Sequence, residues 1–140
     1  MDLTKALSIS ASGMDAQGTR LRVIAENLAN QDTTGASPGA NPYRRKTVTF
    51  ADTVDSQAGD SQAGTKLVTV AQVGEDPSAF PLRYDPSNPA ANAQGYVKLP
   101  NVNSFIEMMD MRDAERSYDA NLSVMQATRS MLSRTIDLLK

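Results

Sequence analysis

The sequence predicts a mainly α-helical protein whose two ends pair as a coiled coil, with a small β-rich insertion between them. Apolar residues recur at every seventh position near both ends, as they do in helices that pack along one stripe. The middle of the chain is instead rich in Pro, Gly and Asn, which interrupt helices. Each apolar repeat needs a helical partner, and the simplest fold therefore pairs the first helix with the last.

The first helix is expected over about residues 4–29, within an N-terminal helical segment 1–30. Asp2 or Thr4 is the predicted N-cap, and the Asn- and Gly-containing stretch after residue 29 is the predicted stop. One heptad row, which with its counterpart in the last helix we call the seam, consists of Leu7, Met14, Leu21 and Leu28. A second row lies about 200° around the helix and predicts further neighbours; it contains Ile9, Ala16 and Val23.

Two glycines weaken this helix. Gly13 and Gly18 each cost about 1 kcal/mol relative to Ala inside a helix, so contacts from outside must compensate. Small residues surround Gly13 and make this half of the helix slender, which allows another backbone to approach closely.

The segment 31–100 is expected to form a small, irregular β unit. With only about 70 residues such a unit is marginal by itself. Short runs rich in β-branched and aromatic residues predict strands at 47–50, 66–70 with Val73, 82–84 and 96–99. Turns or open loops are predicted between them, at 36–42, 55–64 and 85–89.

The C-terminal segment 101–140 is expected to be one long helix that begins near 101–104, just after Pro100, and ends near Leu139. Its part of the seam consists of Tyr118, Leu122, Met125, Leu132, Ile136 and Leu139. Further apolar residues widen the stripe, namely Phe105, Ile106, Met109, Met111, Val124, Met131 and Leu138. Burial of one large apolar side chain is worth about 1.5–3 kcal/mol, so an exposed stripe of this kind promotes association.

Composition excludes several classes of function. A net charge of -2 gives no basic surface for nucleic acid. The chain has no Cys and no His, which removes disulfides, thiolate nucleophiles and the usual zinc ligands. We therefore expect neither an enzyme nor a bound cofactor. No secretory signal or membrane span is recognisable, so by its own signals the chain is cytosolic unless a dedicated export machine reads other features.

Two groups of charged residues can each be interpreted either as a specific binding site or as an ordinary charged surface. The acidic group Glu107, Asp110, Asp113 and Glu115 has the spacing of a hard-cation site, but with Arg112 and Arg116 interleaved it is better interpreted as a solvated or interface face with ion pairs. The basic triplet 44–46 is better interpreted as a solvated edge or a contact to an acidic neighbour than as a nucleic-acid arm.

Both termini resemble one family. Residues 6–14, 20–21 and 25–30 are similar to the N-terminal signature of bacterial flagellar rod, hook and hook-filament-junction proteins. Residues 102–103, 116–121, 131–132 and 137–139 are similar to the terminal helix of the same family. Residues 42–46 and 96–102, with the short middle, resemble the proximal-rod members in particular. The stretch 31–41 lacks the usual Asn-Thr-x-Gly-Tyr turn, which counts against the distal-rod and hook members.

This resemblance implies an axial component of the periplasmic rod. It implies export through the flagellar type III apparatus without a cleaved signal peptide, and polymerisation with copies of itself, other rod subunits and an adaptor at the rod base. No nucleic acid and no membrane insertion are expected. The expected assembly interface consists of Leu7, Ile9, Gly13, Met14, Leu21, Val23, Leu28, Tyr118, Leu122, Val124, Met125, Met131, Leu132 and Ile136.

One alternative remains open at the level of sequence. Paired terminal helices could also clasp a partner's helix, as in a cytosolic coiled-coil adaptor or a chaperone-like binding protein. Sedimentation discriminates between the two, because an adaptor should be a stable small oligomer, whereas a rod subunit should be a labile monomer or should polymerise.

Overall fold

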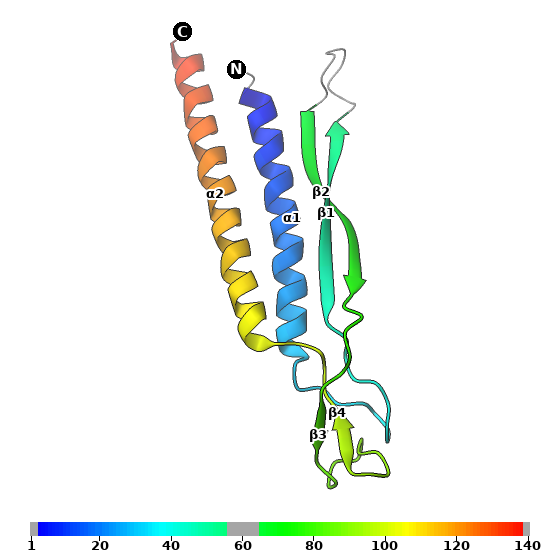
Figure 1. Cartoon of the computed structure of the whole chain (residues 1–140). Coiled ribbons are helices and arrows are strands. Elements are labelled where there is room, and N and C mark those ends of the chain that lie inside the picture. Colours follow the sequence, from blue (N-terminus) through cyan, green and yellow to red (C-terminus); the bar gives the residue numbers. More distant parts are fainter. Residues whose placement is uncertain (1–2, 56–64, 139–140) are drawn as a thin grey trace. The chain divides into compact units, whose positions relative to one another are not determined.

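The computed structural model describes residues 3–55 and 65–138. In chain order the elements are α1 (Leu3–Ala29), β1 (Lys46–Asp55), β2 (Thr65–Glu75), β3 (Leu82–Tyr84), β4 (Tyr96–Lys98) and α2 (Ser104–Asp137) (Figure 1). The predicted class, two long terminal helices that pair and a small β region between them, is confirmed. The proposed N-cap Asp2, the seam residue Leu139 and nearly all of the predicted loop 55–64 lie outside the described residues.

The helix boundaries agree with the prediction to within a few residues. Thr4 is not the N-cap, because α1 already includes Leu3. At the start of α2, Asn103 is the N-cap: its Oδ1 accepts hydrogen bonds from the backbone N–H groups of Phe105 and Ile106, at 3.0 and 3.4 Å. No helix within 3–55 and 65–138 has the length and apolarity that a membrane crossing requires.

Strands β1 and β2 pair with each other and are longer than predicted. Polar cross-strand contacts extend the pairing, since Thr53 and Thr69 share a hydrogen bond of 2.8 Å between their hydroxyls and Lys66 pairs with Asp52 at 3.1 Å. Beyond the predicted runs the strands continue largely through polar and small residues, which have no strong preference for β structure, and their full lengths were therefore not predicted.

The chain divides into two compact units, and the described residues of the first are 3–21, 49–55, 65–72 and 112–138. Within it, α1 has α2 on one side and the β1–β2 pair on another (Figure 1). The backbone N–H of Val68 donates to Ser12 Oγ at 3.3 Å, which ties β2 to α1. Its buried described residues are all small, namely Ser10, Ala16, Ala114 and Thr128. The first unit therefore has no core of large apolar side chains of its own.

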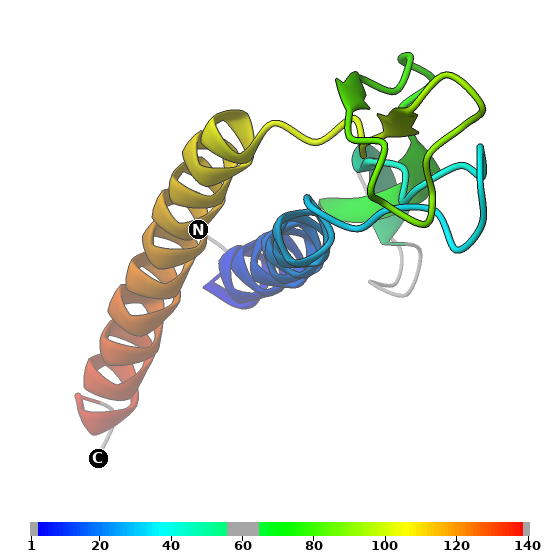
Figure 2. The same cartoon turned by 90° about the horizontal axis from the view of Figure 1, so that it is seen from below.

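The second unit comprises 22–48 and 73–111. Strands β3 and β4 are antiparallel, with Tyr84 opposite Tyr96 and their rings in an edge-on contact at 5.3 Å. The loop around Gly39 lies beside this pair of strands (Figure 2), and the backbone N–H of Gly39 donates a hydrogen bond to Ala90 O at 3.2 Å. The largest fully buried side chains of the second unit are Glu107, Val97 and Asn27, so polar groups make up much of its interior.

Candidate assembly surface

Helices α1 and α2 are in close contact at Gly13. A Cβ built on this residue would lie 2.8 Å from Nδ2 of Asn121, closer than real Cβ atoms come. To move away, Asn121 would have to give up the hydrogen bond that its Nδ2 donates to Ser117 O at 3.0 Å. At Gly18, by contrast, a Cβ would meet nothing within 4 Å among the described residues. Within one chain, a Cβ at Gly13 would therefore displace a side chain of α2, whereas a Cβ at Gly18 would not.

An open groove of about 470 Å³ lies between the two helices in the first unit, lined by Leu7, Ser8, Ala11, Met125, Arg129 and Leu132. Three of these are predicted seam residues, one from α1 and two from α2. Arg129, which interrupts the apolar row in the sequence, contributes the only charged side chain among the groove's described lining residues. The groove is thus apolar with a single basic group at one wall.

The predicted seam residues divide into half-buried and exposed ones. Leu7, Met14, Leu21, Leu28, Met125 and Leu132 are half-buried. On α2 the seam residues Tyr118, Leu122 and Ile136 are exposed, at 36, 37 and 51%. Pairing of α1 with α2 in a single chain therefore covers only part of the predicted apolar stripe.

The residues expected to face neighbours differ in accessibility. Val124 and Met131 are each 50% exposed on α2, and Ile9 is 44% exposed on α1. Val23 is instead only 4% exposed, because the second unit covers this part of α1. Val23 thus contributes to the interior of that unit and does not lie on an exposed face of the chain.

The interpretation of Glu107 as part of a solvated or interface face with Arg112 and Arg116 is wrong. Glu107 is 0% exposed, and its Oε1 accepts a hydrogen bond from Arg45 Nε. Arg45 also lies 3.4 Å from Asp110 and 3.7 Å from Asp76. The true partner is 62 residues away in sequence, in the basic triplet, whose predicted contact with acidic neighbours is confirmed.

Asn27 joins three segments of the second unit. Its Nδ2 donates to Glu107 Oε2 at 3.1 Å and to Lys46 O at 2.9 Å. Its Oδ1 accepts from the backbone N–H of Lys46 at 2.9 Å and from the Tyr43 hydroxyl at 2.8 Å. An amide side chain has two donors and one oxygen with two acceptor positions, so the hydrogen-bonding capacity of buried Asn27 is complete.

Charges around this amide change the titration of Tyr43. Burial, with the nearby Glu26, Glu107 and Glu75 carboxylates, raises the pKa of Tyr43 to about 12. Its hydroxyl is thus kept neutral and able to donate to Asn27.

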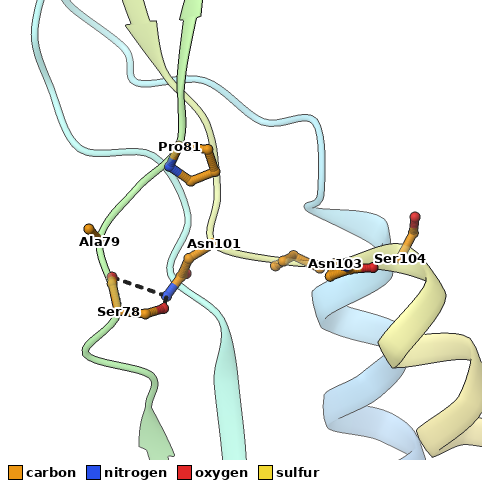
Figure 3. A pocket seen from close by; sticks show the side chains of 7 residues that line it. Ser78, Ala79, Pro81, Asn101, Asn103 and Ser104 are labelled. Carbon is orange, nitrogen blue, oxygen red and sulfur yellow. Dashed lines mark hydrogen bonds between the residues drawn. The ribbon is translucent and has the colours of Figure 1, made fainter.

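Asn101 completes the arrangement. Its Oδ1 accepts from the Arg45 N–H at 2.8 Å, and its Nδ2 donates to Ser78 Oγ at 2.8 Å (Figure 3). We call the whole set the polar cluster; it consists of Glu26, Asn27, Tyr43, Arg45, Lys46, Asp76, Asn101, Glu107 and Asp110.

The pocket beside Asn101, of about 480 Å³, is lined by Ser78, Ala79, Pro81, Asn101, Val102, Asn103 and Ser104 (Figure 3). None of these side chains titrates, so this pocket offers no acid, base or strong nucleophile. Across the described part of the chain, no group of three or more acidic residues is arranged to hold a metal ion. Glu107, Asp110 and Asp113, whose spacing suggested a cation site, therefore do not form such a group.

The features that stand out are thus structural: paired terminal helices with an uncovered apolar stripe, and a polar cluster inside the second unit. Comparison with protein families agrees with this class. Residues 7–36 match the family described as "Flagella basal body rod protein", and residues 93–138 match "Flagellar basal body rod FlgEFG protein C-terminal". Both ends of the chain therefore have the signature of a flagellar rod protein.

Curated relatives match over nearly the full length. The flagellar basal-body rod protein FlgC of Agrobacterium fabrum is 52% identical over 138 residues, which cover 99% of this chain and 96% of the relative. FlgC of Bacillus subtilis is 41% identical, with 96 and 97% covered, and FlgC of Salmonella typhimurium is 42% identical, with 99 and 98% covered. The chain belongs to the FlgC family of flagellar basal-body rod proteins. This family is structural rather than enzymatic, and it excludes the adaptor alternative.

Proposed function

We propose that this chain is a subunit of the proximal rod, which polymerises through its terminal helices and transmits torque along the flagellar drive shaft. The observation that carries the proposal is the uncovered apolar stripe of α2, in a chain similar to FlgC proteins over nearly its whole length. A stripe left in water would be costly for an isolated monomer, whereas subunits in a helical polymer bury it.

The composition of the first unit supports folding during assembly. Its buried described residues are small, and its large apolar side chains are half-buried or exposed. Helices with few buried contacts of their own order only when neighbours cover them. A subunit of this kind remains easy to unfold before assembly, as passage through a type III export apparatus requires, and becomes stiff afterwards.

The proposed partners are other copies of this chain, the rod subunits FlgB, FlgF and FlgG, the rod-base adaptor FliE and, during secretion, the export apparatus. The proposed location is the periplasmic rod, reached without a cleaved signal peptide. Within the chain, the proposed interface consists of the exposed seam residues with Ile9, Val124 and Met131, around the contact of Gly13 with Asn121.

A charge placed in the groove tests the proposal. Leu132→Asp introduces a carboxylate among apolar residues, where an unpaired charge is strongly unfavourable. Because Arg129 lines the same groove and could pair with this carboxylate, Leu132→Lys is the stricter variant. Both should be exported but absent from basal bodies, and cells that rely on them should not swim.

The matched controls are Ser133→Asp, which adds the same charge at the next, exposed position, and Asp137→Ala, which removes an exposed charge. Each variant complements a strain lacking the gene, and basal-body fractions are immunoblotted. Swimming at the unmutated level by both Leu132 variants would show that the C-terminal heptads are not an assembly interface.

A further inference from the structure

We infer that the polar cluster is a register lock: it allows the start of α2 to pack in one alignment only against the end of α1 and the start of β1, and it closes within a single chain before any neighbour binds. The inference rests on contacts inside the second unit and does not depend on the proposed place in the rod.

The first step concerns Glu107. Its side chain is 0% exposed, and each carboxylate oxygen has its own donor: Arg45 Nε on one and Asn27 Nδ2, at 3.1 Å, on the other. A buried carboxylate is tolerated only when it is paired and hydrogen-bonded. Glu107 therefore fits one place in this unit.

The second step compares this contact with the seam. A heptad row is nearly self-similar, because sliding one helix by seven residues again places apolar residues opposite apolar ones. The polar cluster has no such repeat: the same seven-residue slide of α2, about 10.5 Å, would bring Pro100 or Ala114 to the place of Glu107. Neither replacement supplies a carboxylate for Arg45. Hydrogen-bond geometry thus specifies an alignment that the apolar rows leave open.

The third step is that the cluster is complete without a neighbour. Asn27 uses its full hydrogen-bonding capacity inside the unit, and both oxygens of Glu107 are occupied. The contact between them joins residues 80 positions apart, so it forms only when both halves of the chain are present and folded together.

Amide hydrogen exchange of the purified, monomeric full-length chain tests the inference. Segments 26–29, 43–48 and 101–110 should be protected, while 3–21 and 112–138 exchange rapidly. Glu107→Gln puts an amide donor where the cluster offers only donors. Protection of the three segments should fall about 100-fold or more, the scale expected when one partner of a buried ion pair is removed.

The matched control is Asp52→Asn, which removes one partner of the exposed Lys66–Asp52 pair in the first unit. Protection of the second unit should not change in this variant. Protection in Glu107→Gln within tenfold of the unmutated chain would overturn the lock. So would an unmutated monomer whose three segments become protected only after polymerisation.

A double variant separates specificity from stability. Arg45→Met with Glu107→Met removes both charges, and apolar replacement of a buried ion pair commonly preserves stability. We expect protection to return, but with more than one set of amide resonances for residues 101–110, because the alignment is no longer unique. A single set of resonances with full protection would show that the cluster does not specify register.

Discussion

Gly13 gives the sharpest test of how closely the helices approach, because Gly18 in the same helix is an internal control. Replacement of Gly by Ala inside a helix favours the helix by about 1 kcal/mol. At Gly18 a Cβ meets nothing within 4 Å among the described residues, so Gly18→Ala should deliver this whole gain.

At Gly13 the same gain is opposed by the overlap with Asn121, which is 2.8 Å from the built Cβ. The amide either moves, and loses its hydrogen bond to Ser117 O, or forces the helices apart. Loss of a hydrogen bond costs about 0.5–1.5 kcal/mol and overpacking about 1–3 kcal/mol. Gly13→Ala should therefore lie between about 0.5 kcal/mol stabilising and about 2 kcal/mol destabilising, which places it about 0.5–3 kcal/mol below Gly18→Ala in stability.

The assay has two parts. Circular dichroism of the isolated chains should show an equal rise in helicity for Gly13→Ala and Gly18→Ala, since the propensity gain is local. Competition with the unmutated chain for incorporation into basal bodies should then favour Gly18→Ala over Gly13→Ala by about twofold to 100-fold, because about 1.4 kcal/mol corresponds to a factor of ten. Gly13→Leu should be excluded more strongly than Gly13→Ala.

A second substitution identifies the cause. Gly13→Ala combined with Asn121→Ala removes the overlapping amide and should restore incorporation toward the Gly18→Ala level. Equal incorporation of Gly13→Ala and Gly18→Ala, with no effect of Asn121→Ala, would refute the reasoning.

Two further predictions concern the second unit. The pKa of Tyr43 is raised to about 12 from an unfolded value near 10, so its contribution to stability should be complete below about pH 10 and decline as the pH rises toward 12. Near-ultraviolet tyrosinate absorbance and unfolding across this range should show the decline in the unmutated chain. The other three tyrosines are present in both chains, so a smaller decline in Tyr43→Phe than in the unmutated chain would assign the difference to Tyr43, and equal declines would refute the assignment. Gly95→Ala should destabilise the unit by more than about 1 kcal/mol, because Gly95 has φ 81° and a Cβ there would lie 2.9 Å from the Tyr84 ring. Gly39 has φ 76° and a Cβ there would meet nothing within 4 Å among the described residues, so Gly39→Ala should lose stability only through backbone strain. Chemical unfolding followed by tyrosine fluorescence measures the stability of both variants. Equal losses of stability would show that the contact with the Tyr84 ring is unimportant.

The terminal helices were predictable because their evidence is local. Heptad spacing, the absence of Gly and Pro after residue 100 and an Asn N-cap all lie within the segment that they describe. The accessibility of individual positions was less predictable. Val23 continues the same row as Ile9, but one is buried and the other exposed, since the cover over α1 comes from segments distant in sequence.

The polar cluster was not predicted because its contacts are long-range and its members look like ordinary surface residues. Helical spacing suggested Arg112 as a partner for Glu107, yet Arg45 is the partner. One local signal was present: Glu107 is a single carboxylate in an otherwise apolar run, Phe105-Ile106-Glu107-Met108-Met109. If such a run is buried, its lone carboxylate must be paired and hydrogen-bonded, so the run indicates where to look for a buried ion pair.

That run also explains how the start of α2 can be held in place within the chain and still present apolar side chains to a neighbour. An ordinary surface helix turns its apolar side inward and its charges outward. Here the carboxylate of Glu107 points inward, while Phe105 and Met109 are 68 and 56% exposed. Because charge-assisted hydrogen bonds anchor this turn, its apolar side chains need not be used for folding and remain available for a neighbour. Polar contacts can thus fold this part of a subunit before assembly. Its apolar side chains are then still exposed, and they can be buried against a neighbour when the subunit assembles.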